Sequence, residues 1–270
     1  KKTSEAESFV LKFRDVNFIV GSGDKKKNIL TDVSGVVKHG RVLAVMGPSG
    51  AGKTTLISAL TLNAQYGVAT GSVKLNGIPL TFEIFKEHCF VVQQQDKHWP
   101  YLTCRETLKY ATQLYEVVSK DEEDKLVLEI IKKMGLEICA DTMNARLSGG
   151  QRRRLSIGLA LIKQPRVLFL DEPTSGLDAA SSMSIMREIV RVAKEEQLIT
   201  ICTIHQPSTK VYNRFDQVML MSRGRVAYAG NVKDAIPYFD STGHPIPPAT
   251  NPAEFFLDLV NSDFSDETAV

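Results

Sequence analysis

Two short glycine-rich segments carry residue types that bind phosphate. Residues 47–54 read Gly-Pro-Ser-Gly-Ala-Gly-Lys-Thr and lie between an apolar run and a predicted helix. In this pattern the glycines let backbone N–H groups converge on phosphate oxygens, Lys53 would neutralise the β and γ oxygens, and Thr54 would ligate Mg²⁺. The segment therefore predicts a nucleotide site at the end of a strand.

The second segment, residues 147–151, reads Leu-Ser-Gly-Gly-Gln and opens a predicted helix. A serine hydroxyl and free backbone N–H groups at a helix start favour an anion, and the helix dipole adds to this preference. Two such devices would be redundant on one nucleotide in one subunit. This redundancy indicates that each serves a nucleotide held mainly by another copy.

Two carboxylates, Asp171 and Glu172, follow the apolar run at residues 167–170. This places them at the carboxyl edge of a parallel sheet, where ligands bind. Asp171 is positioned for a water-mediated contact with Mg²⁺, and Glu172 is positioned to polarise an attacking water as a general base. A helix-capping pair before Pro173 is the alternative, and the presence of Lys53 argues against it.

Neutral polar side chains flank these acids. His205 ends the next predicted strand, residues 198–204, where an imidazole could bond a γ-phosphate, although a lone histidine is usually structural. Gln93, Gln94 and Gln95 lie where the sheet region passes into a helical block. An amide there could orient a water or contact Mg²⁺. Only one of the three need act, and the spacing to the helical block favours Gln94.

The basic run at residues 152–154 is interpreted as a solvated helix face with some pairing to acids or to a partner's phosphate. Nucleic acid is not expected as a partner, because no aromatic residues interleave with the run and the net charge is only +2. Phe13, Phe18 and Tyr66 are candidates for the core. One of them, with Phe18 the best, could stack on a nucleotide base.

The composition is that of an ordinary globular protein, with 43% hydrophobic and 24% charged residues in 270. The four cysteines are scattered without a CxxC pair, which predicts reduced thiols rather than a disulfide framework or a zinc site. No apolar run approaches the roughly 18 residues that a membrane span needs. No signal peptide is visible.

Strands alternate with helices in a way that predicts an α/β fold with a mainly parallel sheet covered on both faces. We expect the smaller sheet to include residues 72–75 and 89–93, and helices to form an inserted subdomain. The other predicted strands are 9–20, 33–37, 41–46, 166–170, 198–204 and the hairpin 218–221 with 225–228; the predicted helices are 55–62, 105–115, 124–134, 148–162, 179–194 and 253–260.

The motifs together resemble the ATP-binding cassette (ABC) family over nearly the whole chain, which implies a P-loop NTPase, or RecA-like, fold that binds ATP and Mg²⁺. The resemblance implies Walker A at Gly47, Pro48, Ser49, Gly50, Ala51, Gly52, Lys53, Thr54 and Thr55, and the signature at Ser148, Gly149, Gly150 and Gln151. It implies that Gln94 is the Q-loop glutamine and a metal contact beside Thr54 and Asp171 of Walker B. It also implies that Glu172 is the catalytic glutamate, that Asp178 ends the D-loop and that His205 is the switch histidine.

Finer features resemble the G subfamily, namely residues 155–158, 203–208 and 251–256. The resemblance implies a single cassette domain over 1–270. It would comprise a β-subdomain and RecA-like core (1–92 and 165–270) and a helical subdomain (93–164). It implies a second cassette packed head to tail, a membrane domain of the same polypeptide beyond Val270, and a place on the cytoplasmic face of a membrane. Powered export of lipids, sterols or other hydrophobic compounds is the implied function.

Two other functions remain open at this point. A soluble ABC ATPase acting in translation or DNA repair would carry a second cassette or a long coiled coil, and residues 1–270 contain no sustained heptads. A regulatory cassette that only binds ATP is the other alternative. All the residues to which hydrolysis is assigned are present, so we expect a competent ATPase.

Overall fold

The core of the protein is a six-stranded sheet. The predicted phosphate-binding loop at residues 47–54 follows one of its strands, and the acidic pair Asp171 and Glu172 follows another. The computed structural model describes residues 9–115 and 119–261. The strand order is β10-β9-β3-β8-β7-β6, in which all pairs are parallel except β9 with β10. The strands are β3 (Val42–Met46), β6 (Cys89–Val92), β7 (Val167–Leu170), β8 (Ile199–Thr203), β9 (Gln217–Ser222) and β10 (Arg225–Asn231).

Strand β3 shows why the sheet is covered on both faces. All five of its residues are buried, as expected for a parallel strand between two layers. Val42, Ala44 and Met46 belong to one hydrophobic core, whereas Leu43 and Val45 belong to the other. Successive side chains of a strand point to opposite faces, so β3 separates the two cores. The predicted α/β class with a mainly parallel sheet is confirmed.

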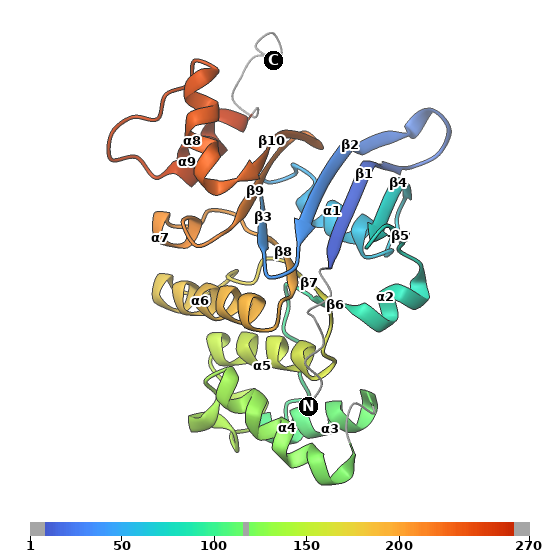
Figure 1. Ribbon diagram of the computed structural model, residues 1–270, viewed down its shortest axis with the longest axis vertical. Coiled ribbons are helices and arrows are strands. Elements are labelled where there is room, and N and C mark those ends of the chain that lie inside the picture. Colours follow the sequence, from blue (N-terminus) through green and yellow to red (C-terminus); the bar gives the residue numbers. More distant parts are fainter. Residues whose placement is uncertain (1–8, 116–118, 262–270) are drawn as a thin grey trace.

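A second, antiparallel sheet packs over one of these cores, in the order β2-β1-β4-β5. Its strands are β1 (Val10–Val20), β2 (Lys27–Lys38), β4 (Val68–Leu75) and β5 (Ile78–Pro79). A short 3-10 helix, Gly23–Lys25, occupies the turn between β1 and β2. Figure 1 shows this sheet beside helix α1 (Lys53–Leu60), away from the helical block.

The prediction that residues 89–93 belong to the smaller sheet is wrong. Strand β6 pairs in parallel with β7, with Cys89 opposite Val167 and Val92 opposite Leu170. A four-residue apolar run does not reveal its partner. Helix α2 (Phe82–His88) precedes β6, and the helices between Cys104 and Ile162 provide the crossover that a parallel pairing with β7 requires. Because of this placement, Gln94 emerges at the same sheet edge as Asp171.

The helical block contains α3 (Cys104–Tyr115), α4 (Lys120–Lys133) and α5 (Gly149–Ile162), with 3-10 turns at Glu137–Cys139 and Asn144–Arg146. Figure 1 shows it at one end of the molecule. At Gly158 of α5, a Cβ would lie 3.2 Å from Ile130 and 3.4 Å from Leu108. The glycine therefore lets α5 approach α4 and α3 closely.

Within the described residues after β7, the helices are α6 (Ala179–Glu195), α7 (Thr209–Tyr212), α8 (Val232–Ser241) and α9 (Pro252–Val260). Helix α8 was not predicted, and Pro237 lies inside it. Its Phe239 stacks near Phe256 of α9, with ring centroids 4.6 Å apart, which fastens both helices to the core. Across the described ranges, no helix is long and apolar enough to cross a bilayer.

Candidate functional site

The loop between β3 and α1 forms the first phosphate-binding device. Gly52 has a φ of +98°, and a Cβ there would lie 2.8 Å from Leu30, so the loop requires glycine at this position. Helix α1 begins at Lys53 without a side-chain cap. The first N–H groups of a helix have no intrahelical acceptor, so they are available to an anion.

Lys53 lies over this loop rather than in solvent. The residue is 6% exposed, and its Nζ donates to the carbonyl oxygens of Gly47 and Pro48, each at 2.8 Å. Burial lowers the pKa of Lys53, and the negative charges of Glu172 and Asp171 oppose that change. Since an ammonium has three donors, one N–H remains for a phosphate oxygen.

Asp171 is held at the edge of the sheet by two threonines. Thr203, at the end of β8, donates its hydroxyl to Asp171 Oδ1 at 2.6 Å, and Thr54 donates to the same oxygen at 3.4 Å. The N–H of Glu172 donates to Thr203 Oγ1 at 2.8 Å. Thr203 therefore orients both acids. Sequence reasoning missed it, although a threonine closing the apolar strand Ile199–Thr203 was the available signal.

Gln94 contacts the proposed base. Its Nε2 donates to Glu172 Oε2 at 2.8 Å and to Ser175 Oγ at 3.3 Å. These contacts single out Gln94 among the three adjacent glutamines, all of which are exposed. The pairing joins the segment after β6 to the segment after β7.

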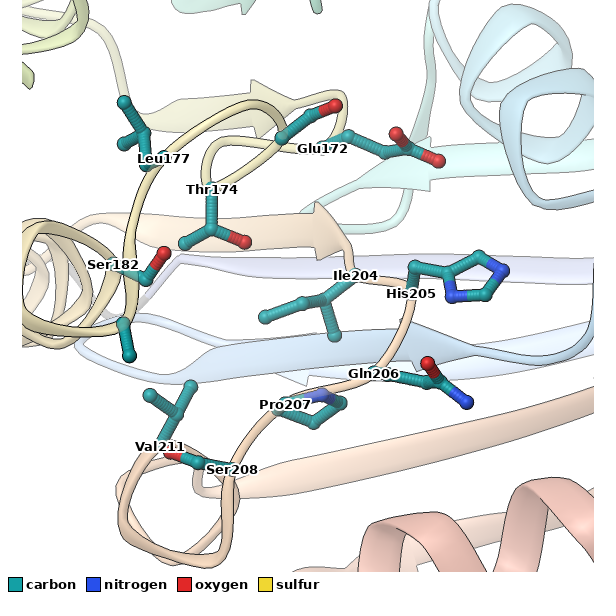
Figure 2. Close-up of a pocket in the computed structure, with 12 residues that line it drawn as sticks. Glu172, Thr174, Leu177, Ser182, Ile204, His205, Gln206, Pro207, Ser208 and Val211 are labelled. Atoms are coloured by element: carbon teal, nitrogen blue, oxygen red, sulfur yellow. The ribbon is translucent and has the colours of Figure 1, made fainter. Parts of the chain in front are cut away.

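Glu172 occupies an unusual backbone conformation, with a φ of +45°. Non-glycine residues in the left-handed region are uncommon and cluster at functional sites. Glu172 lines a pocket of about 410 Å³ together with His205. Figure 2 shows the carboxylate of Glu172 and the exposed ring of His205 extending toward the same side, from the ends of β7 and β8.

The second phosphate-binding device begins α5. Ser148 Oγ accepts a bond from Gln151 N at 3.2 Å, and Ser148 N donates to Gln151 Oε1 at 2.9 Å, which forms a capping box. The Ser148 hydroxyl accepts in this bond and still has its own proton to donate. Across the described residues, no hydrogen bond or ion pair joins Ser148 or Gln151 to Lys53 or Thr54.

The segment after Glu172 lies against this second device. A Cβ at Gly149 would lie 3.1 Å from Leu177, and one at Gly150 would lie 3.8 Å from Ser181. Asp178 is the N-cap of α6, since its Oδ1 accepts from Ala180 N and Ser181 N, both at 2.9 Å. These bonds, with that from the Ser181 hydroxyl, lower the pKa of Asp178.

Comparison with known proteins accounts for this pair of devices. Residues 30–175, more than half of the chain, match the family described as ABC transporter, and residues 205–268 match a family described as ABC-2 type transporter. The chain belongs to the ABC transporter family. Membership implies nucleotide binding. The assignments of residues 47–54 to Walker A and of residues 147–151 to the signature remain predictions from the sequence, and the two names are used for these segments.

Its similarity is to the G family within the ABC transporters. The chain is 42% identical to ABC transporter G family member 1 of Dictyostelium discoideum over 94% of this chain and 34% of that protein. It is 41% identical to ABC transporter G family member 22 of Arabidopsis thaliana over 95% of this chain and 35% of that protein. The chain thus spans about a third of the length of these curated relatives. A soluble ATPase of translation or DNA repair is not favoured.

The side chains present fit Mg²⁺ in this ABC site. Magnesium is usually held by one or two carboxylates together with waters and phosphate oxygens. Thr54 and Asp171 meet at the same sheet edge, and each presents an oxygen. Gln94 donates a hydrogen bond to Glu172 and not to Thr54 or Asp171. For Gln94 to contact the metal, its amide would have to leave Glu172.

The structure corrects the prediction for the base-stacking aromatic. Phe18 is 4% exposed and belongs to the core beneath the antiparallel sheet, and a Cβ at Gly67 would lie 2.5 Å from its ring. Its ring therefore offers no free face to a base. Phe13 is buried as predicted, whereas Tyr66 is exposed and is not a core residue. Phe13 and Phe18 lie an odd number of residues apart, yet both pack inward because the register of β1 shifts between Phe13 and Val16.

The prediction that the basic run is a solvated helix face is wrong for Arg153, whereas the predicted pairing with an acid is present, because Arg153 Nη1 lies 3.2 Å from Asp96 Oδ1. Arg153 is 2% exposed, and its guanidinium donates to the carbonyl oxygens of Gln93, at 2.7 Å, and Gln94. Arg152 donates to Leu147 O at 3.0 Å, and Arg154 donates to Ser184 Oγ on α6 at 2.8 Å. A run of three cations at the start of α5 thus points in three directions, since successive residues of a helix lie on different faces.

Proposed function

We propose that this chain is the ATP-binding and ATP-hydrolysing cassette that powers export by a G-family ABC transporter. The observation that carries the proposal is the contact of Gln94 with Glu172 at the sheet edge where Thr54, Asp171 and Lys53 also meet. A general base, a side chain that orients it and a phosphate cradle are thereby assembled within one chain.

Each side chain has a separate part in hydrolysis. Lys53 and the N–H groups of Walker A hold the phosphates, and Glu172 takes a proton from the attacking water. Gln94 positions that carboxylate, and His205 donates to the γ-phosphate from the end of β8. A bound Mg²⁺ would neutralise charge on the β and γ oxygens, held through Thr54 and Asp171.

A second cassette would complete the site. The Ser148 hydroxyl and the N–H groups of Gly149 and Gly150 lie at the start of α5, where they can donate to a phosphate held by another Walker A. ATP binding would then close a head-to-tail dimer, and hydrolysis at Glu172 would reopen it. The free energy for transport lies in the higher affinity of the closed state for ATP.

The membrane domain of the same polypeptide would dock on the helical subdomain, residues 93–164. A groove of about 860 Å³ there is lined by aromatic and aliphatic side chains, among them the exposed Trp99, Tyr110 and Leu114. Large exposed apolar patches mark interaction sites. The groove adjoins the segment that carries Gln94, so movement of α3 and α5 would reach the hydrolytic centre. In this proposal the cassette lies at the cytoplasmic face of a membrane.

The transported compounds are proposed to be hydrophobic, such as lipids or sterols. The test uses the full-length protein reconstituted in proteoliposomes, with ATP hydrolysis and transfer of labelled phospholipid and sterol measured together. Stimulation of hydrolysis by one class of compound, together with its ATP-dependent transfer, supports that class. Hydrolysis that neither class stimulates contradicts the assignment of hydrophobic substrates and leaves the ATPase assignment standing.

The ATPase assignment is tested with Glu172→Gln. This change keeps the shape of the side chain and removes the base, so turnover should fall at least about 100-fold while ATP binding is retained. Glu87→Gln, on an exposed carboxylate of α2, is the control and should hydrolyse at the wild-type rate. Near wild-type turnover by Glu172→Gln would refute the role of Glu172.

A further inference from the structure

The buried Arg153 is not explained by phosphate binding or by hydrolysis as described above. It lies in the first turns of α5, five residues after Ser148, yet it points away from the signature and into the interior. A buried guanidinium needs hydrogen-bond partners for its donors, because an unpaired buried charge is strongly destabilising. Its partners therefore indicate what it does.

Those partners are on the segment that carries Gln94. The two Nη atoms donate to the carbonyl oxygens of Gln93 and Gln94, and Nη1 lies 3.2 Å from Asp96 Oδ1. A planar guanidinium can donate to two consecutive carbonyl oxygens in a fixed geometry that an ammonium does not reproduce. The backbone of Gln94 is thus attached to α5 directly.

A second residue on the same face of α5 strengthens this attachment. Ser156, three residues after Arg153, donates its hydroxyl to Asp96 Oδ1 at 2.6 Å. His98 Nε2 lies 3.0 Å from Ser156 Oγ and 3.2 Å from Arg152 O. Residues 93–98 are therefore fastened along one side of α5, and Asp96 is shared by Arg153 and Ser156.

The side chain of Gln94 extends from this fastened backbone to Glu172, where its Nε2 donates to Oε2 at 2.8 Å. We propose that Arg153 is a positioning residue for hydrolysis, which holds Gln94 on Glu172 and joins that pair to the helix that begins with the signature. In this arrangement a displacement of α5, caused by the partner's nucleotide at Ser148, moves Gln94 relative to Glu172 in the same chain. The proposal rests on the proposed ATPase function for its kinetic consequences.

The kinetic test uses the full-length protein in lipid and compares Arg153→Met and Arg153→Lys with wild type. A misplaced catalytic group costs up to about 100-fold, so Arg153→Met should lower kcat by about tenfold or more. The KM for ATP should change less than about twofold, because Walker A is untouched. The kcat of Arg153→Lys should lie between those of wild type and Arg153→Met, since lysine keeps the charge and can donate to one carbonyl oxygen.

A double-mutant cycle separates positioning from general damage. In a Gln94→Ala background the side chain that Arg153 positions is gone, so adding Arg153→Met should lower kcat by less than about twofold further. If the fold-losses of kcat in the two single variants instead multiply in the double variant, the proposal is overturned. A rise in KM that matches the fall in kcat would also overturn it.

Arg154→Lys and Arg154→Met are the matched controls, because Arg154 is the next residue on α5 but bonds Ser184 on α6. They report what the loss of an α5 arginine does to packing alone. If they reproduce the kcat pattern of the Arg153 variants, including its disappearance in the Gln94→Ala background, the effect is structural and the proposal fails.

Hydrogen–deuterium exchange gives a readout that does not depend on hydrolysis. Arg153→Lys should speed the exchange of amides in residues 93–98, and Arg154→Lys should not. Unchanged exchange at residues 93–98 would refute the attachment even if the protein is an active ATPase. Faster exchange in a protein whose wild type hydrolyses no ATP would instead refute the proposed function and support the attachment. If Arg153→Met does not fold, Arg153→Lys carries both measurements.

Discussion

Walker A and the signature, the two proposed phosphate-binding devices, both place glycines at a helix start, but they are built differently. At Walker A, the cation Lys53 and the acids Asp171 and Glu172 lie at one sheet edge of the same chain. At the signature, the uncharged side chains of Ser148 and Gln151 form a capping box at the start of α5. Walker A is therefore a chemical site, whereas the signature is a preformed surface.

The difference shows how one chain could supply one half of each of two sites, as the proposed head-to-tail dimer requires. Walker A is fixed between β3 and α1, where the two bonds from Lys53 to backbone carbonyl oxygens leave one N–H for a ligand. The signature sits on the helical block, where its helix start is already capped and needs no ligand to be stable. A site that is complete only with a second copy can thus exist in a well-folded single chain.

The largest expected effect is at Lys53. Lys53→Met removes the buried cation that faces the phosphates, so kcat/KM for ATP should fall at least about 100-fold, as for loss of a preorganised charge in other active sites. Lys210→Met, at an exposed lysine of α7, is the control and should match wild type. ATPase assays and ATP-binding titrations of the full-length protein measure both. Retained ATP binding by Lys53→Met would show that the cation is not what distinguishes Walker A from the signature.

The next effect is at Ser148, and it should appear at the other cassette. In dimers of differently tagged chains, Ser148→Ala and Glu172→Gln on opposite chains leave one intact pair of Glu172 and partner Ser148. About half of the wild-type hydrolysis should remain in that dimer. With both changes on one chain, each site loses one member, and hydrolysis should fall at least about tenfold.

The reverse ranking of these two dimers would mean that the signature serves its own Walker A. Ser148→Asn separates this function from helix capping, because asparagine is as good an N-cap as serine. It should restore the thermal stability that Ser148→Ala loses without restoring the hydrolysis.

A smaller effect is expected at Thr203. It tests whether Asp171 and Glu172 are oriented by their hydrogen bonds to this buried side chain. Thr203→Val leaves Asp171 and the N–H of Glu172 without their hydroxyl partner, which costs about 1–3 kcal/mol of stability. Turnover should fall about tenfold, because Glu172 loses its orientation. Denaturant unfolding and steady-state kinetics measure the two effects.

Thr200→Val is the matched control on the same strand. Both threonines are fully buried, but the Thr200 hydroxyl has no hydrogen-bond partner among the described residues. Its replacement by an apolar side chain should be neutral or stabilising, with normal turnover. Equal losses in the two variants would show that Thr203 acts through packing rather than through its bonds.

The smallest effect is expected at Gln151. It tests whether the capping box with Ser148 stabilises the start of α5 without a ligand. Gln151→Ala removes one half of the capping box and should lower the free energy of unfolding by about 0.5–1 kcal/mol. Gln151→Glu keeps the box and should retain that stability. Thermal unfolding of both variants tests this, and equal losses would show that the box contributes nothing.

The parts of the site that the sequence predicted are those with a local chemical pattern. The Walker A loop, the acids after β7 and the serine at the start of α5 each have their residues within a few positions of one another. Thr203 and Arg153 were missed or misread because their roles depend on partners 32 and 60 residues away. Phe18 was misread because a strand position does not by itself tell which face meets the core.

The sequence by itself determined the α/β class and the helix starts at the two glycine-rich segments, because loop geometry and helix starts depend on neighbours along the chain. The tertiary structure decided that β6 pairs with β7, which brings Gln94 onto Glu172. It also decided that Arg153 is buried against that segment instead of facing water. Strand pairing and the burial of a charge depend on contacts between distant residues, which spacing along the chain does not specify.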